Sequence, residues 1–272
     1  EPWRDTAERW RRIEAFGFDS AWIFDHFMAH DPHAADHTWL EAWTALAGLA
    51  AVTERMRIGI LVSGNTYRPP ALLAKEAVTV DQISGGRLAL GLGAGWHEPE
   101  HRAYGFDFPP PGERVARLAE AVAVIEALQR EERASFAGRF YRLEEAPFAP
   151  KPVRGRLPLV IGTSGPKMLR LVARHADVWN MVGSPEEIAE RGKLLLEACA
   201  AVGRDPAAIR WSAAAWPNKV GGDPLQSPEF YRDLVGRYRE AGVSEVLCMW
   251  GRDTPVQTVE RIAEVLPALR AG

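Results

Sequence analysis

Residues capable of acid–base chemistry follow the first short apolar segment of the chain. The segment Ser20–Phe24 leads directly into Asp25 and His26. In parallel α/β folds the active site lies at the carboxyl ends of the strands. A histidine placed there can move a proton near neutral pH or polarise a substrate oxygen, with its tautomer set by a neighbour. A histidine that bonds a backbone carbonyl at the rim of a barrel is the alternative.

Two segments of small residues follow the next two apolar runs. One follows Met56–Val62 and the other follows Arg87–Leu92. Small residues allow a flat ligand to approach the backbone. The second segment has the spacing G-x-G-x-G before a tryptophan, which is not the dinucleotide-binding fingerprint. The candidates for ligand contact are Ser63 and Asn65 in the first segment and Gly93, Gly95, Trp96 and His97 in the second, with ordinary loops as the alternative.

A third segment, which follows the apolar run Leu157–Ile161, has the composition of a phosphate-binding loop. It consists of Gly162, Thr163, Ser164, Gly165, Pro166 and Lys167. Glycine and hydroxyl residues that open a helix present backbone N–H groups and the positive end of the helix dipole to an anion. Lys167 adds a positive charge. A tight turn with a hydroxyl cap is the alternative.

Tryptophans lie at the ends of the later apolar runs. Trp179, Trp216 and Trp250 are predicted to form the walls of an apolar substrate pocket. Packing in the core is the alternative for each of them.

Histidine clustering raises a rival interpretation, a metal-dependent barrel hydrolase. His26, His30, His33 and His37 lie close together in the sequence. Metal hydrolases use histidine ligands at the rim of a barrel. These four residues lie in a loop rich in Asp and Ala, and the later strand ends lack an obvious pair of His or Asp residues. The sequence therefore favours a site without metal.

The elements that must position these residues alternate along the chain. A helix is predicted at about residues 5–16, followed by seven short apolar strands, each with a helix after it. Strands that are apolar on both faces and separated by helices predict a parallel sheet covered by helices. We therefore expect an α/β fold, a (β/α)₈ barrel forming a single domain over residues 1–272, whose first strand is missing from this chain. An insertion with a hairpin is expected at about 134–156, and an open doubly wound sheet is the alternative fold.

The composition narrows the function. The formal net charge of −3, from 33 basic and 36 acidic residues, argues against the basic face that nucleic-acid binding requires. No apolar run reaches the length of about 18 residues that a membrane span needs, and the N-terminus lacks the apolar region of a signal peptide. Cys199 and Cys248 are interpreted as buried hydrophobic residues. These features predict a cytoplasmic protein that binds no nucleic acid and does not cross a membrane.

Taken in order, the segments resemble the luciferase-like monooxygenase superfamily, and in particular its branch that uses the deazaflavin coenzyme F420. The block from residue 57 to residue 105 is the most specific part of the resemblance. The matching stretches are Gly17–His26, Arg57–Gly59, Arg68–Pro70, Asp81–Gly95, Glu100–Gly105, Phe136–Pro152, Gly162–Lys167, Ala176–Asn180 and Ala241–Glu245.

The resemblance implies a (β/α)₈-barrel oxidoreductase with F420, or alternatively FMN, at the rim, and often a dimer. It places His26 beside the ring and the substrate as the catalytic residue. It also implies a bulge near Leu61 and Val62, often with a cis non-prolyl peptide bond, that backs the ring. Trp96 stands where F420-dependent dehydrogenases often have an acid. The implied cofactor contacts are Asp25, Leu61, Val62, Ser63, Asn65, Gly93, Gly95, Trp96, His97, Gly162, Thr163, Ser164, Gly165 and Lys167.

The implied reaction is hydride transfer between F420 and a small organic substrate, with His26 moving the accompanying proton. An FMN-dependent monooxygenase of the same family is the alternative. A protein that binds the cofactor without turnover is the third possibility.

Overall fold

The computed structural model describes residues 2–30, 38–251 and 253–271. It divides into two compact units. Unit 1 contains Glu1–Ala15 and Asp19–Leu159, and unit 2 contains Phe16–Phe18 and Val160–Gly272. The expectation of a single domain over residues 1–272 stays a prediction.

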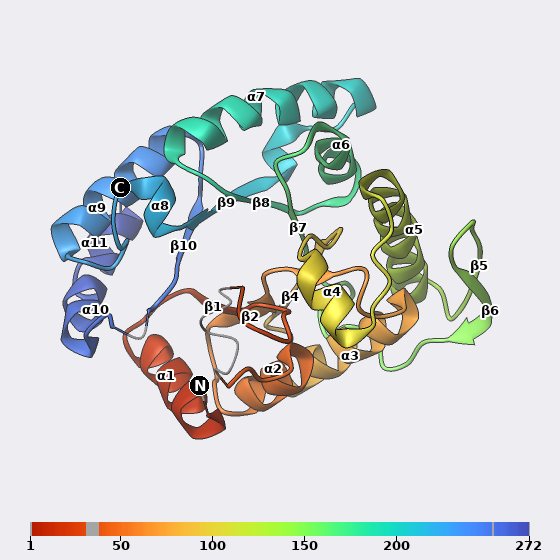
Figure 1. The fold of residues 1–272 in the computed structure, drawn as a ribbon, viewed down its shortest axis with the longest axis horizontal. Helices are drawn as coiled ribbons and strands as arrows, with labels where there is room; N and C mark the ends of the chain where they lie inside the picture. Colours follow the sequence, from red (N-terminus) through yellow and green to blue (C-terminus); the bar gives the residue numbers. More distant parts are fainter. Residues whose placement is uncertain (1, 31–37, 252, 272) are drawn as a thin grey trace. The chain divides into compact units, whose positions relative to one another are not determined.

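Unit 1 is built on short parallel strands covered by helices (Figure 1). Strand β1 pairs with β2, and both β2 and β3 pair with β4, in each case in parallel. The elements are α1 (Trp3–Ala15), β1 (Ser20–Ile23), α2 (Ala42–Ala51), β2 (Arg57–Ile60), β3 (Ser63–Gly64), α3 (Pro70–Ser84), β4 (Leu88–Gly93), α4 (Glu98–Tyr104), α5 (Pro111–Arg130), β5 (Arg133–Ala137) and β6 (Arg142–Pro147).

Strand β4 is central to unit 1, and all six of its residues are buried. A strand with no polar face needs cover on both sides, which is why its sequence is almost wholly apolar. The predicted strand Met56–Val62 is divided into β2 and β3, because the register against β4 shifts across Leu61 and Val62, from Gly59 opposite Ala89 to Ser63 opposite Leu92. Helix α2 begins at Ala42, where the Glu41 side chain accepts hydrogen bonds from the first-turn N–H groups.

Gly91 in β4 leaves room for the backbone of β2. A Cβ atom at this position would lie 1.9 Å from the carbonyl oxygen of Ile60. We expect Gly91→Ala to lower the free energy of unfolding by about 2 kcal/mol, because an overpacked core must shift its backbone. Gly236→Ala is the matched control, since a Cβ there meets no atom within 4 Å and the residue lies inside α9. The control should gain about 0.5–1 kcal/mol. Urea unfolding measures both variants, and equal stability of the two would contradict the close approach.

The predicted insertion is present as an antiparallel hairpin of β5 and β6 (Figure 1). Glu120 on α5 anchors its turn by accepting hydrogen bonds from the backbone N–H groups of Arg139 and Phe140, both at 2.9 Å.

Unit 2 contains the parallel strands β7, β8, β9 and β10, in that order. Ser184 forms a full capping box at the start of α7, and Ser227 caps α9. The elements are β7 (Leu159–Gly162, which begins at the last residue of unit 1), α6 (Pro166–His175), β8 (Val178–Val182), α7 (Pro185–Val202), a 3₁₀ helix (Pro206–Ala208), β9 (Arg210–Ala215), α8 (Pro217–Val220), α9 (Pro228–Glu240), β10 (Glu245–Cys248), α10 (Val256–Ala263) and α11 (Leu266–Ala271).

Within the described ranges, no helix combines the length and the apolar character that a membrane span requires.

Candidate active site

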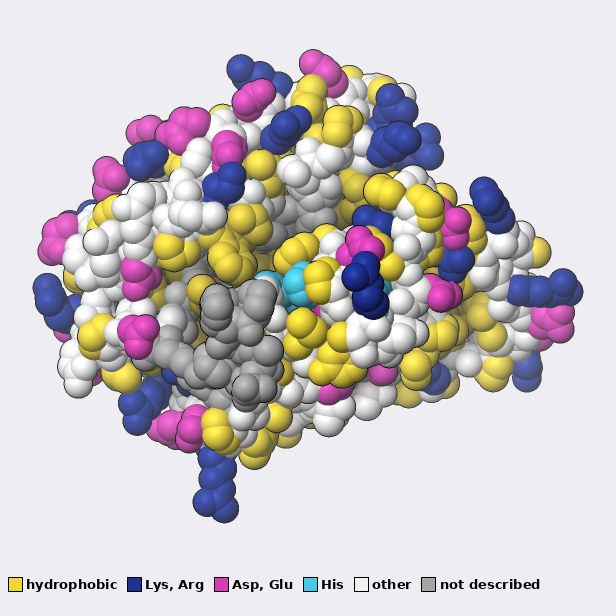
Figure 2. Space-filling view, in the orientation of Figure 1, with side chains coloured by type: hydrophobic (Ala, Val, Ile, Leu, Met, Phe, Trp, Pro, Cys, Tyr) yellow, Lys and Arg dark blue, Asp and Glu magenta, His cyan; other side chains and the backbone are white. Residues whose placement is uncertain are grey.

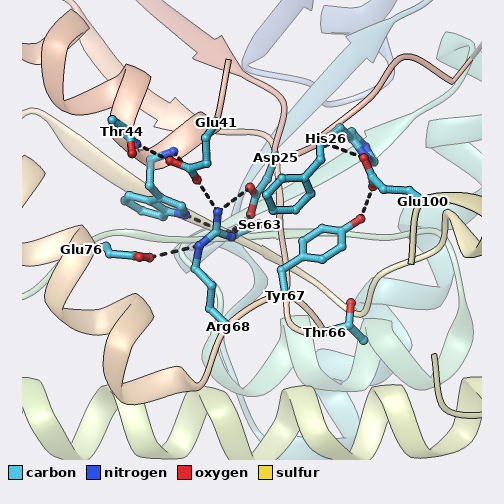
Figure 3. Close-up of polar contacts among 12 residues, drawn as sticks. Asp25, His26, Glu41, Thr44, Ser63, Thr66, Tyr67, Arg68, Glu76 and Glu100 are labelled. Carbon is cyan, nitrogen blue, oxygen red and sulfur yellow. Dashed lines mark hydrogen bonds and ion pairs between the residues drawn. The ribbon is translucent and has the colours of Figure 1, made fainter. Parts of the chain in front are cut away.

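A buried ion-pair network surrounds Arg68 of unit 1 (Figure 3). Its guanidinium group donates to both carboxylate oxygens of Asp25, at 2.7 and 3.1 Å. Glu41 and Glu76 also form ion pairs with it. Burial alone would lower the pKa of Arg68, but the three carboxylates raise it, so the guanidinium stays charged. The network ties the end of β1 to the loop before α3 and to helices α2 and α3.

Several predicted cofactor contacts have partners within the protein. The Ser63 hydroxyl donates to Asp25 and accepts the indole N–H of Trp43 at 3.0 Å. Asn65 is 4% exposed and donates to the hydroxyl of Tyr141 at 3.3 Å. Asp25 itself is 2% exposed and is taken up by Arg68 and Ser63. These hydrogen bonds fix the positions of the three side chains, and their contact with a cofactor stays a prediction.

His26 is held by a fully buried carboxylate. Its Nδ1 lies 2.8 Å from Oε2 of Glu100, which is 0% exposed. The Tyr67 hydroxyl donates to the same oxygen, and the backbone N–H groups of Phe27 and Met28 donate to Oε1 at 2.5 and 3.2 Å. Figure 3 shows His26 and Tyr67 meeting at Glu100, which lies on α4.

The surroundings of Glu100 keep it ionised. Burial would raise its pKa, but the hydrogen bonds from His26, Tyr67 and the backbone of Phe27 lower it to about 2. Burial and the neighbouring Glu100 raise the pKa of Tyr67, so its phenol stays protonated and donates. Because an ionised carboxylate only accepts, the hydrogen of neutral His26 sits on Nδ1 and Nε2 carries the lone pair. This arrangement makes His26 Nε2 a proton acceptor or, when protonated, a donor.

Aromatic rings surround His26. The rings of His30, Trp96 and His97 have centroids 4.2, 5.7 and 6.1 Å from that of His26. Trp96 is 61% exposed, whereas His97 is 8% exposed. Histidine side chains gather on the face shown in Figure 2, next to hydrophobic side chains. The structure thus brings together three predicted site residues, His26, Trp96 and His97.

The bulge implied by the resemblance is present. The peptide bond between Leu61 and Val62 is cis, as expected. Gly93, the last residue of β4, makes room for this segment, because a Cβ there would lie 2.6 Å from Val62. A Cβ at Gly95, which follows β4, would lie 2.7 Å from Thr66. We expected these glycines to allow a ligand to approach, and the structure shows the chain itself in close approach.

The predicted phosphate loop in unit 2 opens helix α6. The first turn of α6 has no side-chain cap at Gly165, although α7 and α9 are both capped by serine. The Thr163 hydroxyl accepts the N–H of Gly165 at 3.1 Å, which shapes the turn. Ser164 and Lys167 are exposed. An uncapped N-terminus among small residues, with a lysine beside it, has the chemistry of an anion site.

The predicted pocket tryptophans differ in their burial. Trp179 is 1% exposed; its ring packs edge-on against Trp211, and its N–H donates to the Thr163 carbonyl at 2.8 Å. This position is in the core of unit 2 and offers no open face. Trp250 donates to the Thr254 carbonyl at 3.0 Å and packs against a buried apolar cluster. Trp216 precedes α8 and is partly buried.

Glu100, Tyr67 and Arg68 are the important residues that the sequence did not single out as site residues. Glu100 looks like an ordinary acidic residue in the first turn of a helix, and it is 74 positions away from His26. The only available signal was its place directly before His101 in a stretch that matches the family.

The histidine cluster does not form a metal-ligand group in the part of the chain that the structure describes, where no three His, Cys, Asp or Glu side chains are placed to hold a metal ion. His33 and His37 lie outside the described residues. His101 has both ring nitrogens in use, with Thr66 at 2.6 Å and the His97 carbonyl at 2.8 Å.

Comparison with known proteins establishes the family. A family model described as luciferase-like monooxygenase matches residues 1–217, and the chain belongs to this family. An uncharacterized protein of Mycobacterium tuberculosis is 33% identical over 231 residues, which are 84% of this chain and 76% of that protein. The F420-dependent glucose-6-phosphate dehydrogenase of Amycolatopsis mediterranei is 33% identical over 175 residues, which are 64% of this chain and 52% of that protein.

Solved structures confirm the fold. An F420-dependent secondary alcohol dehydrogenase, in complex with an F420–acetone adduct, matches with a TM-score of 0.87 and 22% identity, covering 99% of this chain and 96% of that chain. The oxygenating constituent of 3,6-diketocamphane monooxygenase from Pseudomonas putida, in complex with FMN, matches with a TM-score of 0.74 and 16% identity, over 96% and 91% of the chains. These structures confirm the predicted α/β barrel class, and the match to the family model confirms the predicted oxidoreductase.

Proposed function

We propose that this protein is an F420-dependent oxidoreductase that transfers a hydride between the deazaflavin and a small organic substrate. The observation that carries the proposal is the single tautomer of His26, fixed through Nδ1 by the buried, ionised Glu100. A proton carrier of this kind is what a reaction that moves a hydride and a proton together requires. The F420-dependent relative from Amycolatopsis mediterranei supports the choice of cofactor.

The residues present fit such a cofactor. In unit 1, the bulge at Leu61 and Val62 is partly buried and lies at the end of β2, where the resemblance places the ring. In unit 2, the uncapped start of α6 and Lys167 suit a phosphate group, and the loop 162–167 stays the predicted phosphate-binding loop. When bound, the deazaflavin supplies the hydride acceptor or donor.

His26 accepts or donates the proton that accompanies the hydride transfer. When an alcohol is oxidised, the hydride leaves from carbon and Nε2 of His26 takes the hydroxyl proton. When a carbonyl is reduced, the protonated Nε2 returns that proton to oxygen. Glu100 positions the ring and compensates the positive charge that His26 then carries. The location in the cytoplasm and the homodimer stay predictions.

The cofactor is tested by titrating the purified full-length protein with F420 and, separately, with FMN. We expect saturable quenching of F420 fluorescence at micromolar concentration or below, and at least about tenfold weaker binding of FMN, a difference of about 1.4 kcal/mol. Preferential binding of FMN would replace the proposal by the alternative, a flavin monooxygenase, which the description of the matching family favours. Binding of neither would overturn the proposal.

A further inference from the structure

Two ring nitrogens beside His26 are buried and lack a hydrogen-bond partner. They are Nε2 of His30 and Nε2 of His97. The two rings have centroids 5.0 Å apart, and both contact Trp96, at 4.8 and 4.9 Å. No other histidine among the described residues has such an atom. Leaving a buried polar atom unpaired costs about 1–3 kcal/mol, so two such atoms on neighbouring rings indicate a ligand.

The chemistry of that ligand follows from the state of the two rings. Burial and the neighbouring histidines lower the pKa of His30 to about 4, and burial likewise lowers the pKa of His97. Both rings are therefore neutral near pH 7 and can each offer one N–H or one lone pair. A neutral ring matches an uncharged hydroxyl or carbonyl better than a phosphate or a carboxylate, which favour cationic partners.

The two rings lie beside His26, and this placement indicates which part of the substrate they can contact. His26 is assigned to the reacting oxygen, and the ring of His30 lies edge-on to it at 4.2 Å. Any oxygen bound by His30 or His97 must then belong to a carbon close to the reacting one. The exposed ring of Trp96 offers an apolar surface for the carbon chain between them.

We propose that Nε2 of His30 and Nε2 of His97 bind a second, uncharged oxygen of the substrate, so that the enzyme prefers vicinal diols or α-hydroxy ketones to simple alcohols and ketones. This inference rests on the proposed function, because it takes the reacting oxygen to be at His26. It makes His30 and His97 specificity-determining residues.

The test uses two probes that differ by one hydroxyl group, propane-1,2-diol and propan-2-ol. Each is titrated into the F420-loaded protein with ¹⁵N-labelled histidine, and the Nε2 signals are followed by NMR. We expect the diol to shift the signals of His30 and His97 and to bind about tenfold more tightly than propan-2-ol, the effect of one hydrogen bond of about 1.4 kcal/mol. The signal of His175, on α6 of unit 2, is the internal reference and should not move.

Variants separate hydrogen bonding from packing. His97→Phe keeps a ring but removes the nitrogens, and should abolish the advantage of the diol, whereas His97→Gln, which keeps a polar nitrogen, should retain most of it. Equal affinity for the two probes in the wild-type protein, or an unmoved pair of histidine signals, would overturn the inference. Because F420 binding is measured first by fluorescence, a failure of the proposed function is distinguished from a failure of this inference.

Discussion

Replacing Glu100 with glutamine is expected to reduce turnover about 10²- to 10⁴-fold while leaving the affinity for F420 within about threefold, the range by which general acid–base groups contribute to catalysis. The reduction should fall on kcat rather than on KM. Glu100 acts through His26 and is a positioning residue, so its loss should leave the binding of cofactor and substrate largely unchanged.

The size of this effect follows from the four hydrogen bonds that Glu100 accepts. One carboxylate oxygen serves the backbone N–H groups of Phe27 and Met28, and the other serves His26 and Tyr67. A glutamine has one carbonyl oxygen and one NH₂ group. If the oxygen stays with the backbone, the NH₂ group faces His26 and forces its proton from Nδ1 to Nε2. The lone pair that should accept the substrate proton is then lost.

The matched control is Glu98→Gln, on the same helix. Glu98 is exposed and forms a surface ion pair with Arg102 at 3.0 Å. Such pairs contribute about 0–1 kcal/mol, and this substitution should leave kcat unchanged. NMR of ¹⁵N-labelled histidine reports the tautomer of His26 directly. Wild-type turnover in Glu100→Gln, or an unchanged His26 tautomer, would remove Glu100 from the mechanism.

The fold was largely predictable because it rests on local patterns. Buried parallel strands need continuous apolar runs, so β4 can be predicted from the sequence. Helix starts favour capping residues, so the starts of α7 and α9 can be predicted as well. The division of one predicted strand into β2 and β3 was expected only through the family resemblance. A run such as Ile60-Leu61-Val62 gives no local sign that its backbone bulges.

The site was less predictable because its contacts are distant in sequence. His26 was identified from its place after a strand, but the partner that fixes its tautomer lies on another element, 74 positions away. Gly93 and Gly95 were predicted to contact a ligand, and this stays a prediction. A sequence indicates that something approaches a glycine, but it does not show which group approaches. In the structure, Ile60, Val62 and Thr66 occupy that space.

The second large effect is expected at Arg68, whose replacement by methionine should lower the free energy of unfolding by about 3–5 kcal/mol. Arg68 is 9% exposed in its side chain and Asp25 is 1% exposed, so removing the guanidinium leaves a buried carboxylate without its partner. Ser63 still donates to Asp25, but one hydroxyl cannot compensate a full charge in the interior.

A double variant tests this origin of the effect. In Arg68→Met with Asp25→Asn, the uncompensated charge is gone, and we expect the double variant to be more stable than Arg68→Met alone by about 1–3 kcal/mol, the coupling typical of residues in contact. Arg102→Met is the control, because its ion pair with Glu98 is exposed and should contribute less than about 1 kcal/mol. Urea unfolding at pH 7 gives the free energies of unfolding of the wild-type protein and of the three variants. If Arg68→Met is as stable as Arg102→Met, the network around Arg68 does not hold β1, α2 and α3 together, and Asp25 must be held by Ser63 and by apolar packing instead.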